Sequence, residues 1–306
     1  MSDPFEAAAQ RVLTAFRRQR PLRAGSLIIT LFGDSLAPRG GSISLASLIA
    51  VMASFGLGER LVRTAVGRLA RDGWLEAHRA GRLSYYGLSK LGRARFAEAT
   101  RRIYSAPPRV WSGRWTLVFA QGDGRSRRRL RSDLEWLGFG QIGAGCFAHP
   151  DADIARVRRE LEEPALLDSA LALEASAVSP DGDRRIISRG WNLEQLEARY
   201  RRFLQLFSPL LDAARRSRPR TTEASLIVRT LLIHEYRRIH LRDPQLPHAL
   251  LPPNWPGAAA YDLTRTLYRL VFRVADGHLS GIATTRRGNL PEPVRSLARR
   301  FGKPRT

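Results

Sequence analysis

The sequence predicts an α+β protein with more than one domain. Apolar residues recur with helical spacing through the first hundred residues, short apolar runs alternate with helical segments between residues 115 and 177, and long helical patterns return after residue 192. With 306 residues, of which 43% are hydrophobic, the chain can bury a substantial core. We therefore expect two or three modest domains rather than one.

The first domain, residues 1–104, is predicted to contain helices followed by a β-hairpin and a further helix. Residues 26–32 form an apolar run that ends at Gly33, and residues 44–52 have helical spacing after a Gly-Gly break. Residues 77–88 predict a hairpin, because a glycine-centred basic segment precedes an aromatic strand. This order of elements is typical of a winged helix-turn-helix domain.

An amphipathic helix is predicted over residues 58–72, directly before the hairpin. Gly58 is its expected N-cap, and Gly73 its C-terminal stop. Its apolar side is formed by Leu61, Val62, Ala65, Val66 and Leu69. Its cationic side is formed by Arg60, Arg63, Thr64, Arg68 and Arg71. One face is thus predicted to pack, while the other is free to contact an anion.

The charge of the whole chain also indicates an anionic partner. Lys and Arg number 51 against 28 Asp and Glu, a formal net charge of +23. Such an excess is typical of proteins that bind a polyanion. The alternative is an arginine-rich composition in which much of the excess is simply solvated, so the charge needs a motif beside it.

The second domain, residues 105–185, follows a predicted linker that contains Pro107 and Pro108. Its predicted elements are a strand at 115–120, a helix at 125–137, extended pieces near 141–142 and 146–148, a helix at 151–162 and a strand near 171–177. The order βαββαβ predicts a ferredoxin-like domain.

The third domain, residues 186–306, is predicted to be helical. After a turn at 181–183, helices are predicted at 193–214, 222–239 and 258–274, with a Pro-rich interval at 243–257. The single cysteine, Cys146, excludes an intramolecular disulfide framework and a multi-cysteine zinc site. Because the chain has no long apolar run and no secretory signal pattern, we expect a soluble, cytoplasmic protein.

Several motifs resemble one known family along nearly the whole chain. They are residues 27–34, Phe55-Gly56-Leu57 with Val62-Arg63, Arg68-Leu69, Gly73-Trp74-Leu75, Ser84-Tyr85-Tyr86, Arg102-Ile103-Tyr104, residues 136–140, His234-Glu235-Tyr236-Arg237-Arg238 and residues 250–257. In this order they resemble the PaaX family, the transcriptional repressors of bacterial phenylacetate catabolism. The last two motifs, after a ferredoxin-like middle, are specific.

The resemblance implies a homodimeric repressor that binds a double-stranded DNA operator, with no enzymatic activity, no cofactor and no membrane partner. It implies a winged helix-turn-helix domain, a central domain similar to a CRISPR-associated ferredoxin-like nuclease, and a helical C-terminal domain for ligand sensing. The dimer would form through the central or the C-terminal domain. The family inducer is phenylacetyl-CoA, so the expected effector is an aryl-acyl-CoA. Gly58 stands where a Ser-type cap is expected, and glycine caps a helix nearly as well.

The helix at 58–72 is the expected recognition helix. Arg60, Arg63 and Thr64 are candidates for reading bases, because the start of such a helix enters the major groove and an arginine fork matches two acceptors of guanine. Further candidate DNA contacts are Arg68, Arg71, Arg79, Arg82, Ser84 and Tyr85. Tyr85 and Tyr86 alternate faces, so one packs and the other contacts DNA or solvent. The alternative for each arginine is an ordinary solvated position.

A ligand-sensing pocket is predicted around the motif at 234–238. Its candidate residues are His234, Tyr236, Arg237, Arg238 and Trp255, because an arginine fork suits a phosphate or carboxylate and aromatic rings suit an aromatic acyl group. The alternative is a buried polar network that clamps this helix to the Pro-rich segment. A metal site at His234, Glu235 and His240 is disfavoured, because the histidines lack the four-residue spacing of a zinc helix.

Two other classes of function stay open. A metal-dependent nuclease would use the ferredoxin-like domain, with Asp123 as its catalytic acid in the loop after the first strand. An aspartate flanked by glycines is also ordinary turn chemistry, which we favour. The third possibility is a DNA-binding scaffold that senses no ligand.

Overall fold

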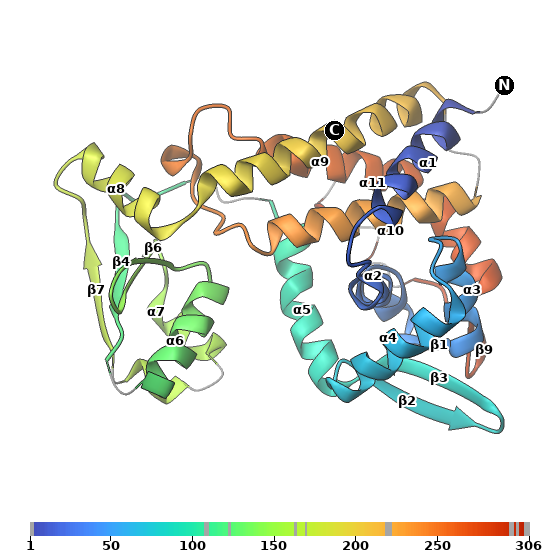
Figure 1. The fold of residues 1–306 in the computed structure, drawn as a ribbon. Helices are drawn as coiled ribbons and strands as arrows, with labels where there is room; N and C mark the ends of the chain where they lie inside the picture. The colour runs from blue at the N-terminus through green and yellow to red at the C-terminus, as the bar shows by residue number, and fades with distance from the viewer. Residues whose placement is uncertain are drawn as a thin grey trace. The chain divides into compact units, whose positions relative to one another are not determined.

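The computed structural model describes residues 3–106, 110–121, 124–161, 164–168, 170–217, 222–293, 297 and 300–302. The predicted linker residues Pro107 and Pro108 lie outside this part of the chain. The fold is α+β, as predicted, and it divides into two compact units (Figure 1). Unit 1 comprises Met1–Ala106, Arg202–Arg238 and Ala259–Thr306, and unit 2 comprises Pro107–Arg201 and Ile239–Ala258.

The N-terminal part of unit 1 is mainly helical. Its elements are α1 (Pro4–Arg17), α2 (Ala24–Leu31), a π turn (Phe32–Leu36), β1 (Ser42–Ser44), α3 (Leu45–Ala53), α4 (Glu59–Arg71), β2 (Leu75–Ala80), β3 (Leu83–Leu88) and α5 (Lys90–Tyr104). The sequence predicted that this helical segment ends at Gly33. Instead, α2 continues directly into the π turn, which includes Gly33. The segment after α2 is buried, so packing overrides the weak helix propensity of glycine.

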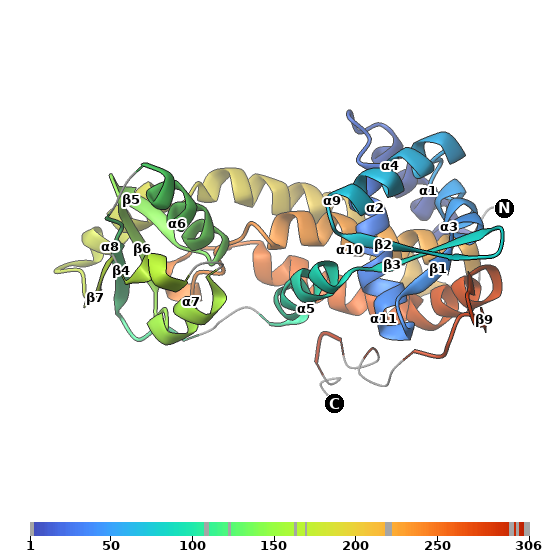
Figure 2. The same ribbon diagram turned by 90° about the horizontal axis from the view of Figure 1, so that it is seen from below.

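A small antiparallel sheet completes this part of unit 1. Its strand order is β1-β3-β2, and β2 and β3 form a hairpin whose turn extends away from the neighbouring helices (Figure 1 and Figure 2). Strand β1, which was not predicted, pairs Ser44 with Tyr85. Three residues are too few to show a period of two in the sequence.

Unit 2 contains a four-stranded antiparallel sheet of order β5-β6-β4-β7. Its elements are β4 (Trp115–Phe119), α6 (Gly124–Trp136), β5 (Gly140–Gly143), β6 (Cys146–Pro150), α7 (Ile154–Glu160), β7 (Leu171–Ala175) and α8 (Pro180–Gly190). On one face Val118 and Phe147 pack with Leu130 and Leu134 of α6. On the other face Trp115 packs against the segment that follows α10.

Helix α8 replaces the turn that was predicted at residues 181–183. Pro180 occupies its first position, and the Ser179 side chain accepts a hydrogen bond from the Gly182 amide. Asp181 and Asp183 then lie in the first turn, where the helix dipole favours negative charge. The residues that suggested a turn are therefore the start signals of a helix.

The remaining helices are long. They are α9 (Leu193–Arg216), α10 (Thr222–His240) and α11 (Gly257–Ile282), and β8 (Thr284–Thr285) and β9 (Gly288–Asn289) follow.

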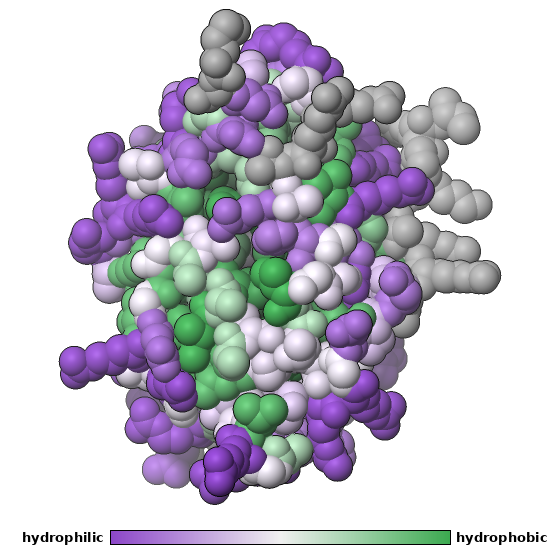
Figure 3. Space-filling model, turned by 90° about the vertical axis from the view of Figure 1, so that its right-hand side faces the viewer, coloured by the Kyte–Doolittle hydropathy of each residue, from purple (hydrophilic) through white to green (hydrophobic). Residues whose placement is uncertain are grey.

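In the part of the chain that the structure describes, no helix is both long and apolar enough to cross a membrane. Hydrophilic side chains project around an area where hydrophobic side chains gather on the face shown in Figure 3.

Candidate functional site

Helix α4 carries its apolar and cationic residues on opposite faces. Val62, Val66 and Leu69 are buried. The side chains of the predicted cationic face are all exposed, namely Arg60, Arg63, Thr64, Arg68 and Arg71. The prediction that Leu61 belongs to the buried side of the helix is wrong, because this residue is 40% exposed. Consecutive helix residues are about 100° apart, so Leu61 falls outside the narrow buried stripe.

The bounds of α4 confirm the signals read from the sequence. Gly58 is the N-cap in an extended conformation, and it has no side chain to cap the helix. After the helix, Gly73 adopts a φ of 72°, a left-handed conformation that glycine adopts without strain. The cationic face is thus one regular helical surface.

Two of the predicted base-reading residues have partners within α4. Arg63 forms an ion pair of 2.7 Å with Glu59, and the Thr64 hydroxyl donates a 2.8 Å hydrogen bond to the Arg60 carbonyl. An exposed ion pair of this kind is worth about 0–1 kcal/mol, so a phosphate or a base can replace Glu59 at little cost. Thr64 keeps its methyl group and its acceptor capacity for a partner.

The hairpin places its basic residues at the turn and buries one tyrosine. Arg79 pairs with Ser84 across the strands, and both Arg79 and Arg82 are exposed. Tyr85, which the sequence analysis placed among the DNA contacts, is only 8% exposed. Tyr86 is half-buried and is the more accessible of the two. Successive side chains of β3 point to opposite faces of the sheet, and Tyr85 lies on the buried face.

The base of the hairpin is fixed to the end of α4. The Trp74 amide donates to the Leu69 carbonyl at 2.9 Å, and the Ser89 amide donates to the Trp74 carbonyl at 3.1 Å. The Arg95 guanidinium lies 5.2 Å from the centre of the Trp74 ring, within the range of a cation–π interaction. The cationic helix and the hairpin therefore form one positioned surface.

The motif at 234–238 lies against α2 and the segment before it. His234 Nδ1 lies 3.0 Å from the Thr30 hydroxyl, and Arg237 donates to the same hydroxyl at 2.7 Å and to the Ser26 carbonyl at 2.7 Å. Arg238 donates to the Gln19 side chain at 3.1 Å. These contacts form the buried polar network considered above, with α2 as the partner in place of the Pro-rich segment.

Burial dominates the electrostatics of this motif. Desolvation, followed by the charges of Arg237 and Arg238, holds the pKa of His234 well below its usual 6.5. Burial and the charge of Arg238 lower the pKa of Arg237 to about 10. Tyr236 is fully buried and packs near Phe203, with ring centres 5.9 Å apart. A ligand role for these residues stays a prediction.

Trp255, the fifth predicted ligand contact, belongs to unit 2. Its ring meets Tyr200 edge-on, with centres 6.1 Å apart. The Tyr200 hydroxyl donates to the Asp243 carboxylate at 2.7 Å and lies 3.2 Å from His240 Nδ1. Gln245 closes the cluster, since its amide lies 2.8 Å from His240 Nε2. A polar cluster thus holds the Pro-rich segment against α9 and α10.

A buried carboxylate that the sequence analysis missed connects distant parts of unit 1. Asp34 is 2% exposed and accepts hydrogen bonds of 2.6–3.0 Å from four side chains, which are Arg229, Arg300, Tyr104 and Tyr268. Arg229 also contacts Asp276, which pairs with the buried Arg39. The signals available in the sequence were an aspartate after an apolar run and its place at the end of the motif at residues 27–34.

The two guanidiniums determine the ionisation of this cluster. Burial pushes the pKa of Asp34 upward, but Arg229, Arg300 and the two tyrosine hydroxyls outweigh it, so the pKa lies below its usual 3.8. Burial, despite the opposing charge of Arg229, raises the pKa of Tyr268 to about 12. Asp34 is therefore ionised and the tyrosines are neutral donors near neutral pH.

Asp123, the predicted catalytic acid of the alternative nuclease, lies outside the described residues. Among the residues that are described, no three histidines, cysteines or carboxylates gather as metal ligands.

An exposed cationic helix fixed beside a basic hairpin, in an α+β fold, defines a candidate nucleic-acid-binding protein. Residues 23–92 match the family "PaaX-like protein", residues 108–187 match "PaaX protein central Cas2-like domain" and residues 191–281 match "PaaX-like protein C-terminal domain". Over 287 residues the chain is 37% identical to the transcriptional repressor PaaX of Escherichia coli (strain K12), covering 92% of this chain and 91% of that protein.

The chain therefore belongs to the PaaX family. Among solved structures, the uncharacterized protein Rv0674 from Mycobacterium tuberculosis has a similar fold, with a TM-score of 0.50 and 23% identity. That similarity covers 76% of this chain and 90% of the other.

Proposed function

We propose that this protein is a transcriptional repressor that binds an operator in double-stranded DNA and controls an aromatic, phenylacetate-type catabolic operon. The observation that carries the proposal is the exposed row of arginines on α4 beside the hairpin. The family membership and the repressor name of a relative that is 37% identical support it. In this proposal residues 1–104 form a winged helix-turn-helix domain, 105–185 a ferredoxin-like domain, and 186–306 a domain for ligand sensing and dimerisation.

The proposed DNA contacts divide into base reading and backbone positioning. Arg60, Arg63 and Thr64 enter the major groove, where arginine forks read guanine and the threonine methyl group contacts an apolar base edge. Arg68 and Arg71 contact phosphates, as do Arg79, Arg82 and Ser84 from the hairpin. Tyr86 takes the place of Tyr85 at the margin of this surface, because Tyr85 is buried.

Regulation requires two conformations with different affinities for DNA and ligand. We propose a homodimer on a palindromic operator, in which the two recognition helices match successive major grooves. An aryl-acyl-CoA, with phenylacetyl-CoA as the first candidate, binds better to a conformation in which that match is lost. A coupling of about 1–3 kcal/mol between the two sites is typical of such switches.

Selection from a random DNA library, followed by fluorescence anisotropy, tests DNA recognition. Each bidentate base contact contributes about 1–3 kcal/mol of discrimination, so Arg63→Ala should weaken operator binding about 5- to 150-fold. Arg216→Ala is the matched control, because it removes one exposed arginine from α9. Equal effects of the two variants would reduce the role of α4 to general electrostatic attraction.

Adding phenylacetyl-CoA to the preformed operator complex tests the effector. Release of the DNA is expected at saturating thioester. Operator binding that is insensitive to phenylacetyl-CoA and to related thioesters removes the effector from the proposal and leaves DNA binding intact. Cleavage of the DNA with magnesium, abolished by Asp123→Ala, would instead support a nuclease.

A further inference from the structure

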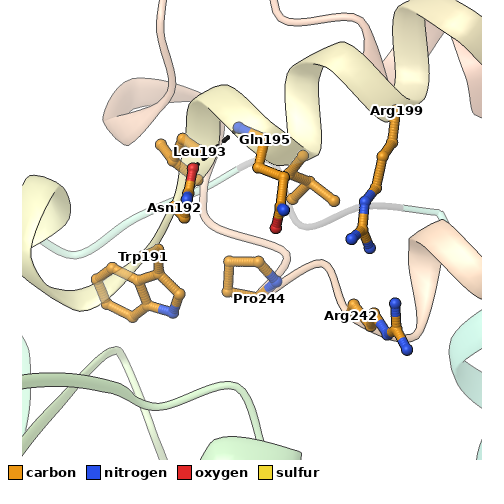
Figure 4. A pocket seen from close by; sticks show the side chains of 8 residues that line it. Trp191, Asn192, Leu193, Gln195, Arg199, Arg242 and Pro244 are labelled. Atoms are coloured by element: carbon orange, nitrogen blue, oxygen red, sulfur yellow. Dashed lines mark hydrogen bonds between the residues drawn. The ribbon is translucent and has the colours of Figure 1, made fainter.

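A pocket in unit 2 combines two arginines with an aromatic wall. It has a volume of about 280 Å³ and lies between the start of α9 and the segment after α10 (Figure 4). The lining residues that matter here are Trp191, Asn192, Gln195, Arg199, Arg242 and Pro244. The sequence analysis assigned no role to the two arginines.

The helical period explains why three of these side chains line the same pocket. Asn192, Gln195 and Arg199 are spaced by three and four residues, so they share one face of α9. Figure 4 shows the two guanidiniums at one end of the pocket and the Trp191 ring at the other, with Pro244 between them. The pocket therefore has a cationic end and a flat apolar end.

The aromatic wall is held in place from behind. Trp191 Nε1 donates a 3.1 Å hydrogen bond to the Gly138 carbonyl, and its ring stacks on Trp115 with centres 6.1 Å apart. Gly140 lies so close that an added Cβ would meet the Trp191 ring at 2.6 Å. The ring is thus a fixed surface rather than a flexible one, and a rigid wall lowers the entropic cost of binding.

The two arginines at the cationic end are sequence neighbours of residues in the polar cluster of Tyr200, His240 and Asp243. Arg199 precedes Tyr200, and Arg242 precedes Asp243, so the 2.7 Å hydrogen bond from Tyr200 to Asp243 fixes the backbone that carries both arginines. The Asp243 carboxylate also accepts a 2.7 Å hydrogen bond from the backbone amide of Gln245. The arginines are thereby presented together by a preorganised scaffold.

The charge of the pocket favours an anionic ligand. None of the described residues that line it is a carboxylate, whereas two are arginines. Each guanidinium carries a fork of N–H donors that matches two oxygens of an anion. Phosphate oxygens match this geometry, and a planar base can stack on Trp191.

The volume limits what the pocket can enclose. Sites that enclose a whole drug-sized ligand measure roughly 300–1,000 Å³, so 280 Å³ suits one end of a larger molecule. We propose that the pocket of Trp191, Arg199 and Arg242 binds the phosphorylated adenosine end of a CoA thioester. The phosphates meet Arg199 and Arg242, the adenine stacks on Trp191, and the Gln195 amide pairs with the edge of the base. This inference rests on the proposed function for the choice of a CoA thioester.

Titration calorimetry on the full-length protein tests the pocket with four probes. These are phenylacetyl-CoA, CoA, adenosine 3′,5′-bisphosphate and phenylacetate. The wild type should bind the three phosphorylated probes, and Arg199→Ala and Arg242→Ala should each weaken them about tenfold or more, because each removes a charged hydrogen-bonding fork. Arg216→Ala on the same helix should leave all affinities unchanged. Circular dichroism should show that the variants, altered only at incompletely buried side chains, stay folded.

Operator release separates this proposal from the proposed function. If phenylacetyl-CoA releases the wild type but not the two pocket variants, the assignment stands. If it releases all of them at the same concentration, the pocket assignment is overturned and the effector is retained. If the wild type itself is not released, the effector is wrong, and binding of adenosine 3′,5′-bisphosphate still decides the pocket. Binding of phenylacetate alone, lost in both variants, would overturn the nucleotide assignment.

Discussion

Replacing Asp34 by asparagine should strongly destabilise unit 1, because the substitution removes a buried negative charge without changing the size of the side chain. In the native cluster the carboxylate accepts hydrogen bonds at 2.7 Å from both Arg229 and Arg300. Without it, Asp276 is the one carboxylate among the described partners of these arginines and Arg39. Three guanidiniums would then share a single carboxylate among the described residues.

The expected loss follows from the cost of breaking a buried ion pair. Such a change costs about 3–5 kcal/mol, a large part of the roughly 5–15 kcal/mol that typically stabilises a protein. In urea, where unfolding free energies of small proteins change by about 1–3 kcal/mol per molar, the midpoint should fall by about 1 M or more. The measurement is equilibrium urea unfolding followed by circular dichroism.

Glu135→Gln is the matched control for Asp34→Asn. It removes the same charge from a surface ion pair with Arg131. The Arg131 side chain is 53% exposed and the Glu135 side chain 45%, so the loss of unfolding free energy should be at most about 0.5 kcal/mol. A loss below about 1 kcal/mol for Asp34→Asn would refute the reasoning, since it would mean that water or rearrangement compensates the arginines.

Acid unfolding provides a second check on Asp34. The folded pKa lies below the usual 3.8, so the ionised form is favoured by folding. This contribution to stability is complete above pH 3.8 and is lost as the pH falls below it through the folded pKa. The wild type should therefore lose stability relative to Asp34→Asn in this range, and parallel acid profiles would contradict the assignment.

Three further predictions concern other parts of the chain. Glu59→Gln should tighten operator binding about two- to fivefold in anisotropy titrations, because it frees Arg63; weaker binding would contradict this. The folded pKa of His234 is depressed, so stability should fall as the pH drops below 6.5, by up to about 1.4 kcal/mol per unit, and His234→Gln should flatten this slope in urea unfolding. Tyr200→Phe should cost about 1–3 kcal/mol, because buried Asp243 loses the hydrogen bond from the Tyr200 hydroxyl; an unchanged unfolding midpoint would argue against that bond.

Local patterns predicted most of the helices and strands because local interactions determine them. The spacing of Val62, Val66 and Leu69 identified the buried face of α4, and Gly58 and Gly73 marked its ends. The same reasoning placed the strands and helices of residues 115–175 near their observed bounds. It gave no helix over Pro4–Arg17, where α1 lies. It also predicted a turn at 181–183 inside α8, because Pro, Asp and Gly are both turn residues and helix-start residues.

The sequence by itself determined the α+β class, the cationic face of α4 and the motifs that indicate the PaaX family. Only the tertiary structure decided that Tyr85 is buried, that the arginines of the 234–238 motif hold α2, and that Arg199 and Arg242 meet at one pocket. Asp34 is the clearest case, since its partners Arg229 and Arg300 lie 195 and 266 residues away. Periodicity reports contacts within one helix or strand, whereas pairings between distant segments depend on how the elements pack.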